Sequence, residues 1–307
     1  MRISVPSAIA QLKGGRVVAL PTETVYGLAA SLSQPKAIEE IFKLKGRPLG
    51  NPLIIHVSSL SDIEYYARKI PPRFNELALA FWPGPLTLIV PIQPDLVPPL
   101  VRAHLPTAGF RMPRHPMTLE VIEASGPLVM PSANLSGKPS ATSYEHVETD
   151  FGKNFPVLDG GSCSQGLEST ILYYEESRWM IGRLGAIAAE EFESILGYVP
   201  ALFKAEKPIC PGQFFRHYAP KAKLFLGDRS KLNEVSFVLG FTERHYPPDK
   251  KVLFMGSIFK AEEVAEHLYQ VLRQLDVEGA SEAWVDMDFP REGLWMTVEE
   301  RLVKAGE

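Results

Sequence analysis

Cysteine is scarce in this sequence, which has only Cys163 and Cys210 among its 307 residues. Two cysteines so far apart exclude a disulfide framework and a four-cysteine metal cluster, and they fit a reducing, cytoplasmic compartment. Long apolar stretches are also lacking. Residues 1–16 have no apolar core of the signal-peptide kind, and no run approaches the roughly 20 residues of a membrane span. We therefore expect a soluble protein with no membrane contact.

Charge of one sign is not concentrated anywhere in the chain. The net charge is -4, and 22% of the residues are charged. This composition excludes the basic signature of a dedicated nucleic-acid-binding protein, so any anion site must be local. The chain also lacks the G-x-x-x-x-G-K-[ST] and G-x-G-x-x-G patterns, a Ser-His-Asp order and histidines at metal-ligand spacing. Zinc enzymes and triad hydrolases are disfavoured, and no metal site made of protein ligands is expected.

Short apolar runs bounded by glycine or proline are the main structural signal. They predict buried strands over residues 17–20, 53–57, 86–90 and 128–130. A helix is predicted to begin near Pro35, which suits a first helical turn. Segments 169–174 and 178–183 flank a polar turn and predict a hairpin, which makes the sheet mixed.

The chain is long enough for two domains with packed cores. We predict a first domain over residues 1–204 and a small α/β domain over residues 223–307. Between them, residues 205–222 are rich in proline, basic and aromatic residues and are interpreted as a linker. The second domain is expected to contain three strands, a helix over about 261–275, a fourth strand and a final helix.

Hydroxyl and carboxylate side chains follow the first predicted strand, in the motif PTETVYGL at residues 21–28. Polar groups at the carboxyl end of a strand lie where open α/β sheets bind ligands. Threonine and glutamate before an apolar stretch also cap helices. Both interpretations stay open at this point.

Two groups of cations come next. Lys43, Lys45 and Arg47 follow the predicted helix and could neutralise a triphosphate. Cations at a helix end are also favoured by the helix dipole, so a solvated helix end is the simpler interpretation. Arg111 and Arg114 are predicted to share one face of a strand, where a bound carboxylate or phosphate competes with a structural salt bridge.

A loop of small residues, PSANLSG at residues 131–137, offers hydroxyls and an amide suited to a carboxylate or phosphate. Arg183 closes the predicted hairpin, and His56, on an apolar strand, is expected to be a core histidine. Together these residues indicate a cavity that binds an anionic small molecule such as ATP and acts by positioning and electrostatics.

Six motifs in this order resemble one known family: PTETVYGL, KLKGRPLGNPLIIHV, FWPGPLTLIV, GFRMPRHP, PSANLSGKPSATS and ESTI. They resemble the YrdC-like domain of threonylcarbamoyl-AMP synthases. CPGQFFRHYAP and the segment after it are similar to the longer, two-domain form, so the resemblance covers about the whole chain. It implies an α/β fold, with an open twisted mixed sheet around a concave basic cavity and a smaller Rossmann-like C-terminal domain.

The resemblance also implies roles for individual residues. L-threonine is expected at Thr24, His56, Arg111, Ser132 and Ser169. ATP is expected at Arg47, Asn51, Thr107, Asn134, Thr142, Arg183 and Tyr218. Charge on the reacting phosphates is expected to be stabilised by the catalytic residues Lys45, Arg47 and Arg183. A lid over the cavity is implied for the linker residues Arg216, His217 and Tyr218.

The implied activity is a nucleotidyl transfer that condenses L-threonine, bicarbonate and ATP into threonylcarbamoyl-AMP and pyrophosphate, for threonylcarbamoyladenosine modification of tRNA. Mg²⁺ carried by ATP is the expected cofactor, and tRNA threonylcarbamoyl-transfer enzymes are the expected downstream partners. Two alternatives remain. An RNA-binding module, with weak RNA binding, is disfavoured by the acidic balance. A carbamoyl transferase similar to part of the hydrogenase-maturation proteins is disfavoured by the missing zinc-finger cysteines.

Overall fold

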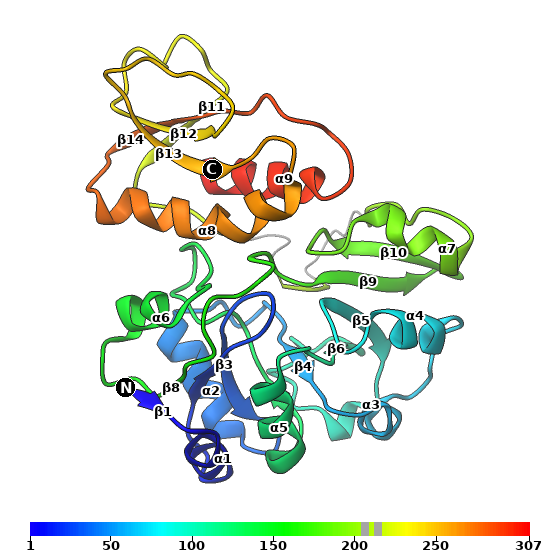
Figure 1. Ribbon diagram of the computed structural model, residues 1–307. Helices are drawn as coiled ribbons and strands as arrows, with labels where there is room; N and C mark the ends of the chain where they lie inside the picture. Colours follow the sequence, from blue (N-terminus) through cyan, green and yellow to red (C-terminus); the bar gives the residue numbers. More distant parts are fainter. Residues whose placement is uncertain (204–208, 212–216) are drawn as a thin grey trace.

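The computed structural model describes residues 1–203, 209–211 and 217–307, and two sheets organise them (Figure 1). The larger sheet has ten strands in the order β1-β8-β2-β3-β7-β4-β6-β5-β9-β10. These strands are β1 (Arg2–Ile3), β2 (Val18–Leu20), β3 (Gly27–Ser31), β4 (Ile54–His56), β5 (Leu86–Pro91), β6 (Thr107–Arg111), β7 (Leu128–Val129), β8 (Val157–Leu158), β9 (Thr170–Glu175) and β10 (Arg178–Arg183). The sheet contains both parallel and antiparallel pairs, and β9 and β10 form a hairpin, so both predictions are confirmed.

Helices pack around this sheet and bury most of its strands. They are α1 (Val5–Lys13), α2 (Pro35–Lys45), α3 (Leu60–Tyr66), α4 (Phe74–Phe81), α5 (Pro116–Ser125), α6 (Tyr144–Phe151) and α7 (Glu193–Leu196), with the short 3-10 helices η1 (Pro94–Leu96) and η2 (Ala189–Phe192). The predicted apolar runs all become strands with buried side chains. No helix of the described residues has the length and apolar character needed to cross a membrane.

Helix α2 shows how local sequence positions a functional side chain. Pro35 occupies its first turn, where a missing N–H is tolerated, and Gly46 ends it in the left-handed conformation with φ of 60°. Ile38 and Ile41 are buried in the core of the first domain. Because the helix is held on this apolar face, its last residue, Lys45, is carried into the protein interior.

Strand register brings several predicted site residues to one edge of the sheet. Strands β4 and β6 are parallel, and their last residues, His56 and Arg111, lie opposite each other. Strand β5 is antiparallel to β6 and parallel to β9, so Ser169, just before β9, lies at this same edge. The return strand β10 ends at Arg183, beside the start of β9. Residues from four strands therefore converge without being close in sequence.

One prediction about this edge is wrong. Arg111 and Arg114 do not share a strand face, because β6 ends at Arg111 and Arg114 is exposed on the segment that follows. Their spacing of three also does not match the two-residue period of a strand.

The smaller sheet is parallel throughout, in the order β11-β14-β12-β13. Its elements are β11 (Lys223–Leu226), β12 (Phe237–Phe241), β13 (Lys251–Gly256), α8 (Ala261–Val277), β14 (Glu282–Val285) and α9 (Trp295–Gly306). This arrangement agrees with the predicted Rossmann-like unit. Helix α8 lies between the smaller sheet and the first domain (Figure 1).

The two domains share part of one apolar core. Val25, from the PTETVYGL segment, and Leu167 belong to the cluster built around α8 and α9. Gly166 lies so close to α8 that a Cβ atom there would be 2.3 Å from the carbonyl oxygen of Ala265. Only a residue without a side chain allows this backbone approach.

Candidate functional site

A cavity of about 650 Å³ lies over the convergence of strands in the first domain and is bordered by the chain that leads to the second. Ten of the predicted site residues line it: Lys45, Arg47, Asn51, His56, Arg111, Ser132, Asn134, Ser169, Arg183 and Tyr218. Ile54 and His56, two residues apart on β4, both line the cavity, so it extends along one face of this strand.

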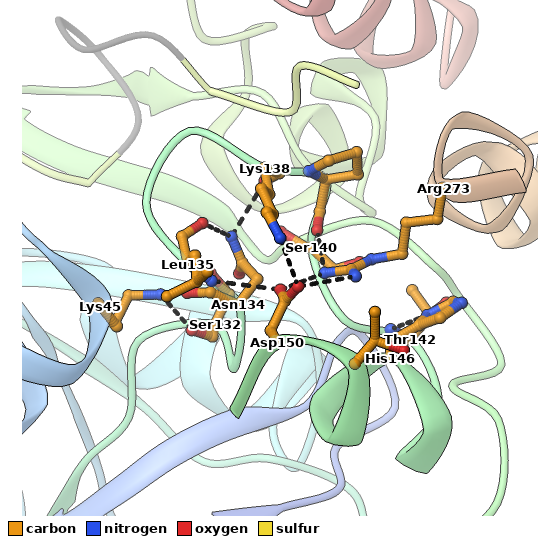
Figure 2. A network of polar contacts seen from close by, with 12 residues as sticks. Lys45, Ser132, Asn134, Leu135, Lys138, Ser140, Thr142, His146, Asp150 and Arg273 are labelled. Atoms are coloured by element: carbon orange, nitrogen blue, oxygen red, sulfur yellow. Dashed lines mark hydrogen bonds and ion pairs between the residues drawn. The ribbon is translucent and has the colours of Figure 1, made fainter. Parts of the chain in front are cut away.

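The loop over residues 131–140 forms one wall, and Lys45 holds it from the end of α2. The Lys45 ammonium donates to the backbone carbonyl oxygens of Ser132 and Asn134, the latter at 2.6 Å (Figure 2). Burial, and then the charge of Arg47, lower the pKa of Lys45 well below its usual value. Two of its three N–H groups are used by the loop, so Lys45 anchors the wall as well as lining the cavity.

Arg47 and Arg183 place two positive charges at the cavity, and neither forms a salt bridge with a carboxylate among the described residues. Arg47 donates to the backbone oxygens of Asn51 and Pro52, at 3.2 and 2.6 Å. Arg183 donates to the backbone oxygen of Ser169 at 2.8 Å and to its hydroxyl at 3.1 Å. Burial, and then the charge of Arg183, lower the pKa of Arg47 to about 9, which leaves it charged at neutral pH. Two cations near each other favour a bound anion.

Arg111 already has an anionic partner, which favours the salt-bridge interpretation of this residue. Its Nη2 donates to Oε1 of Glu23 at 2.7 Å, and both side chains are about 5% exposed. Burial opposes ionisation of Glu23, but Arg111 outweighs it and lowers the pKa of Glu23. Nη1 of Arg111 has no acceptor among the described residues, so the guanidinium keeps a donor while Glu23 fixes its plane.

His56 is neutral at the same edge of the sheet. Its Nδ1 lies 3.3 Å from the backbone oxygen of Ile54. Burial, and then the nearby Arg111, lower the pKa of His56 to about 3. A neutral imidazole with so low a pKa is a weak base, so this residue shapes the cavity and can exchange hydrogen bonds but does not remove protons at neutral pH.

Two residues of the cavity wall each have a buried amide oxygen without a hydrogen-bond partner among the described residues. The two oxygens are Oδ1 of Asn51 and Oδ1 of Asn134. The Asn134 amide is oriented by its own nitrogen, which donates to the backbone oxygens of Leu135 and Lys138 at 2.9 and 3.0 Å. An unpaired buried acceptor is unfavourable by about 1–3 kcal/mol, so a small movement that exposes either oxygen to a hydrogen-bond donor of a ligand would be favoured.

Three predicted site residues do not line this cavity. Thr24 is fully buried, and its hydroxyl bonds that of Thr22 at 2.8 Å. Thr107 begins β6, at the opposite end of the strand from Arg111. Thr142 lines a second cavity of about 690 Å³ between α6 and α8, and its N–H donates to Nδ1 of His146 at 3.2 Å. No role is assigned to these threonines by the geometry of the first cavity.

Tyr218 lines the cavity from the chain between the domains. It has a positive φ of 65°, stacks on Tyr269 of α8 with 5.3 Å between ring centroids, and lies under the guanidinium of Arg301. His217 lines the cavity beside it. Arg216, the third predicted lid residue, lies outside the described residues. Tyr218 is therefore attached to the second domain while it faces the first.

Comparison with known proteins matches both halves of the chain. A family described as telomere recombination matches residues 10–185, and a family described as the C-terminal domain of threonylcarbamoyl-AMP synthase matches residues 187–306. A threonylcarbamoyl-AMP synthase of Pyrococcus abyssi is 38% identical over 315 residues, which cover 96% of this chain and 91% of the relative. One of Bacillus subtilis is 38% identical over 321 residues, covering 98% and 92%.

The chain belongs to the threonylcarbamoyl-AMP synthase family. A crystal structure titled P. abyssi Sua5 complexed with L-threonine has a TM-score of 0.91 and 34% identity, and the match covers 100% of this chain and 96% of that one. Membership confirms the resemblance, the fold class and the prediction of an enzyme that transfers a nucleotidyl group.

Sequence reasoning missed the charged residues that join the two domains of this synthase fold. Glu168, beside the cavity, accepts from Ser140 at 2.6 Å, from Tyr269 at 2.7 Å and from Arg301 at 3.1 Å. Burial opposes its ionisation, but Arg301, Arg183 and these hydrogen bonds lower the pKa of Glu168 to about 2. One signal existed: Arg301 interrupts the apolar stripe of α9, on the face of the helix that is buried.

Proposed function

We propose that this protein condenses L-threonine, bicarbonate and ATP into threonylcarbamoyl-AMP and pyrophosphate. The observation that carries the proposal is the pair of guanidinium groups, Arg47 and Arg183, that line the cavity and form no salt bridge with a carboxylate among the described residues. A triphosphate is the ligand whose charge suits such a pair. The family supplies the identity of the other two substrates.

The residues that line the cavity form two groups of different chemistry. Arg47, Asn51 and Asn134 supply a cation and two side-chain amides, which suit a nucleotide with its phosphates and hydrogen-bond donors. His56, Arg111 and Ser169 supply a neutral imidazole, a guanidinium and a hydroxyl, which suit an amino acid with a carboxylate. We assign the first group to ATP and the second to L-threonine, together with the hydroxyl of Ser132.

The reaction has two steps. The threonine amine attacks carbon dioxide formed from bicarbonate, and a carbamate and water result. A carbamate oxygen then attacks the α-phosphorus of ATP, its bond to the bridging oxygen of the β-phosphate breaks, and pyrophosphate leaves. Negative charge grows on the phosphate oxygens, where Arg47 and Arg183 stabilise it. No strong protein base is required, which agrees with the low pKa of His56.

Magnesium is assigned to the substrate and not to the protein. Among the described residues no three His, Cys, Asp or Glu side chains cluster as metal ligands, and Glu168 is engaged by Arg301, Tyr269 and Ser140. We propose that Mg²⁺ enters on the triphosphate and shares the work of neutralising it. The proposed product serves tRNA threonylcarbamoyl-transfer enzymes in the cytoplasm. Direct RNA binding is not proposed, because the net charge is -4.

The test is pyrophosphate release by the purified protein with MgATP, bicarbonate and labelled threonine. We expect release to require threonine and to match threonylcarbamoyl-AMP formation one for one. Arg183→Gln should lower kcat by roughly 100-fold or more, as for loss of a donor to a reacting anion. Arg178→Gln, at the exposed start of the same strand, is the matched control and should keep full activity. Threonine-independent release, or full activity of Arg183→Gln, would contradict the proposal.

A further inference from the structure

The buried carboxylate of Asp150 accepts hydrogen bonds from the 131–140 loop and from a side chain of the second domain. The Asp150 side chain, on α6 of the first domain, has no exposed surface. It accepts from the N–H of Leu135 at 3.3 Å and from Nζ of Lys138 at 3.1 Å, both in the loop. It also accepts from Nη2 of Arg273, on α8 of the second domain, at 2.8 Å (Figure 2).

Arg273 contacts the loop directly as well. Nη2 also donates to the backbone oxygen of Pro139 at 2.6 Å, and Nε donates to that of Ser140 at 3.4 Å. The side chain is about 9% exposed, so these contacts are made away from solvent. The Arg273 guanidinium of the second domain thus donates to the Asp150 carboxylate and to two consecutive backbone carbonyl oxygens of the loop.

The loop transmits this contact to the cavity. Asp150 binds Leu135 and Lys138, and the backbone oxygens of these same two residues accept from the side-chain nitrogen of Asn134. The orientation of the Asn134 amide in the cavity wall therefore depends on the separation of Leu135 and Lys138. Among the described residues, no hydrogen bond joins Asn134 directly to Arg273.

We propose that Arg273 is a positioning residue: from the second domain it sets the shape of the 131–140 loop, and through that loop it positions Asn134 in the wall of the cavity that binds the nucleotide. The identity of the nucleotide as ATP rests on the proposed function. The geometry gives the second domain a part in nucleotide binding through this side chain, in addition to Asp276 of α8, which lines the cavity itself. Arg273 touches no substrate in this arrangement, so its effect is on affinity for the nucleotide and not on the chemical step.

The experiment compares two arginines of the second domain that each bind a buried aspartate. Arg273→Met removes the contact between domains and leaves Asp150 with Lys138 as its partner. Arg244→Met is the matched control, because Arg244 forms its ion pair inside the second domain. Its Nη1 donates to both carboxylate oxygens of Asp286, at 2.7 and 2.8 Å. Affinity for a nonhydrolysable ATP analogue and for L-threonine is measured by calorimetry, and KM and kcat by pyrophosphate release.

We expect Arg273→Met to weaken nucleotide binding and raise KM for ATP about tenfold, with threonine affinity changed less than about threefold and kcat at saturation nearly kept. Amide exchange in residues 131–140 should accelerate in this variant. Arg244→Met should alter none of these values. Arg273→Lys keeps the positive charge but loses the planar guanidinium with its several donors, so its nucleotide affinity should lie between those of wild type and Arg273→Met. This variant replaces Arg273→Met in the test if the methionine variant does not fold.

Unchanged nucleotide affinity in Arg273→Met, or in Arg273→Lys if only that variant folds, would overturn the positioning role. An equal loss in Arg244→Met would also overturn it, because the effect would then be general destabilisation. The proposed function fails separately. If wild type binds nucleotide but makes no threonylcarbamoyl-AMP, while Arg273→Met loses nucleotide affinity, the positioning role stands and only the assigned reaction is lost.

Discussion

The ion pair between Arg111 and Glu23 determines how the group of cavity residues assigned to L-threonine can act. Removing Arg111 takes away the cation assigned to the threonine carboxylate, whereas removing the charge of Glu23 leaves that cation without its internal partner. We predict that Arg111→Gln weakens threonine binding at least tenfold and changes ATP-analogue binding less than about threefold. Glu23→Gln should keep or strengthen threonine binding. Calorimetry with both ligands checks this, and equal losses for the two ligands in Arg111→Gln would contradict it.

Both variants will be less stable than wild type. A buried charge that loses its partner destabilises a protein by about 3–5 kcal/mol. Binding should therefore be measured at a temperature where circular dichroism shows each variant to be folded. Arg114→Gln, three residues further along and exposed, is the control for a nearby arginine and should leave threonine binding unchanged.

His146 makes stability depend on pH between about 4 and 6.5. It accepts the N–H of Thr142 only when neutral. Burial, and then Arg273, lower the pKa of His146 to about 4, while Glu145 and Asp150 act in the opposite direction. Below the unfolded pKa of roughly 6.5 the unfolded chain binds a proton that the folded protein does not, so stability is lost as pH falls through this window.

We predict that the free energy of unfolding of wild type falls by on the order of 1 kcal/mol between pH 7 and pH 5 through this residue. His146→Gln, which keeps an acceptor, should remove this part of the fall in urea titrations, whereas the parts due to His56 and His115, whose pKa values burial also lowers, should remain. Asp150 and Glu168 titrate at lower pH and lie outside this window, because their pKa values are also lowered. His245→Gln, at an exposed position, should leave the slope unchanged. An identical slope in His146→Gln would contradict the prediction.

At this scale the sequence predicted the residue types of the cavity better than their partners. Lys45, Arg47 and Arg183 all line the cavity, but two of the three N–H groups of Lys45 donate to the 131–140 loop. Glu23 was identified as a polar group in PTETVYGL, but its pairing with Arg111 spans 88 positions and no local pattern encodes it. Thr24, Thr107 and Thr142 do not line the cavity, and the hydroxyls of Thr24 and Thr142 lie against the neighbouring side chains Thr22 and His146.

Among the elements, α8 depends on a glycine in the other domain. Gly166 and Gly161 both have positive φ, of 68° and 79°, but a Cβ on Gly166 would overlap the α8 backbone, whereas one on Gly161 would meet nothing within 4 Å. We predict that Gly161→Ala costs about 1–2 kcal/mol of unfolding free energy from backbone strain alone. Gly166→Ala should cost about 1–3 kcal/mol more, from overlap. Urea unfolding measures both, and equal costs would contradict the close approach.

The elements themselves were largely predictable, because short apolar runs, Pro35 and the polar turn before Arg178 are local signals. Which of these elements lie beside one another in the fold was not predictable. The pairing of β4 with β6 that sets His56 beside Arg111 joins segments about 50 positions apart, and apolar periodicity does not identify which strands meet. The prediction that Arg111 and Arg114 share one face of a strand was wrong because it assumed that β6 continues past Arg111.

In the whole molecule, the shared core predicts that the two domains unfold together. Leu268 of α8 is fully buried in the cluster that also contains Val25 and Leu167 of the first domain. We predict that Leu268→Ala lowers the free energy of unfolding by about 2–5 kcal/mol and lowers hydrogen-exchange protection in β9 as well as in α8. Val277→Ala, on the exposed end of the same helix, should have little effect. Full protection of β9 in Leu268→Ala would show that the domains open independently.

The sequence indicated two domains but not how they meet. Arg273 and Arg301 lie on amphipathic helices whose apolar stripes were visible, and a cation within such a stripe is a signal of a buried ion pair. The stripe does not say that the acceptors, Asp150 and Glu168, belong to the other domain. Only the fold shows that.

The contact made by Val25 has a consequence for recombination of such chains. Because a residue of PTETVYGL packs into the second core, a chimera cut in the linker would separate Val25 from Val264, its cluster partner 239 positions further along the sequence. A donor C-terminal half would bring its own α8 and α9 without the Val25, Gly166 and Leu167 that they require. The exchangeable unit of this molecule is therefore discontinuous, and includes a piece of the segment that leads into the cavity.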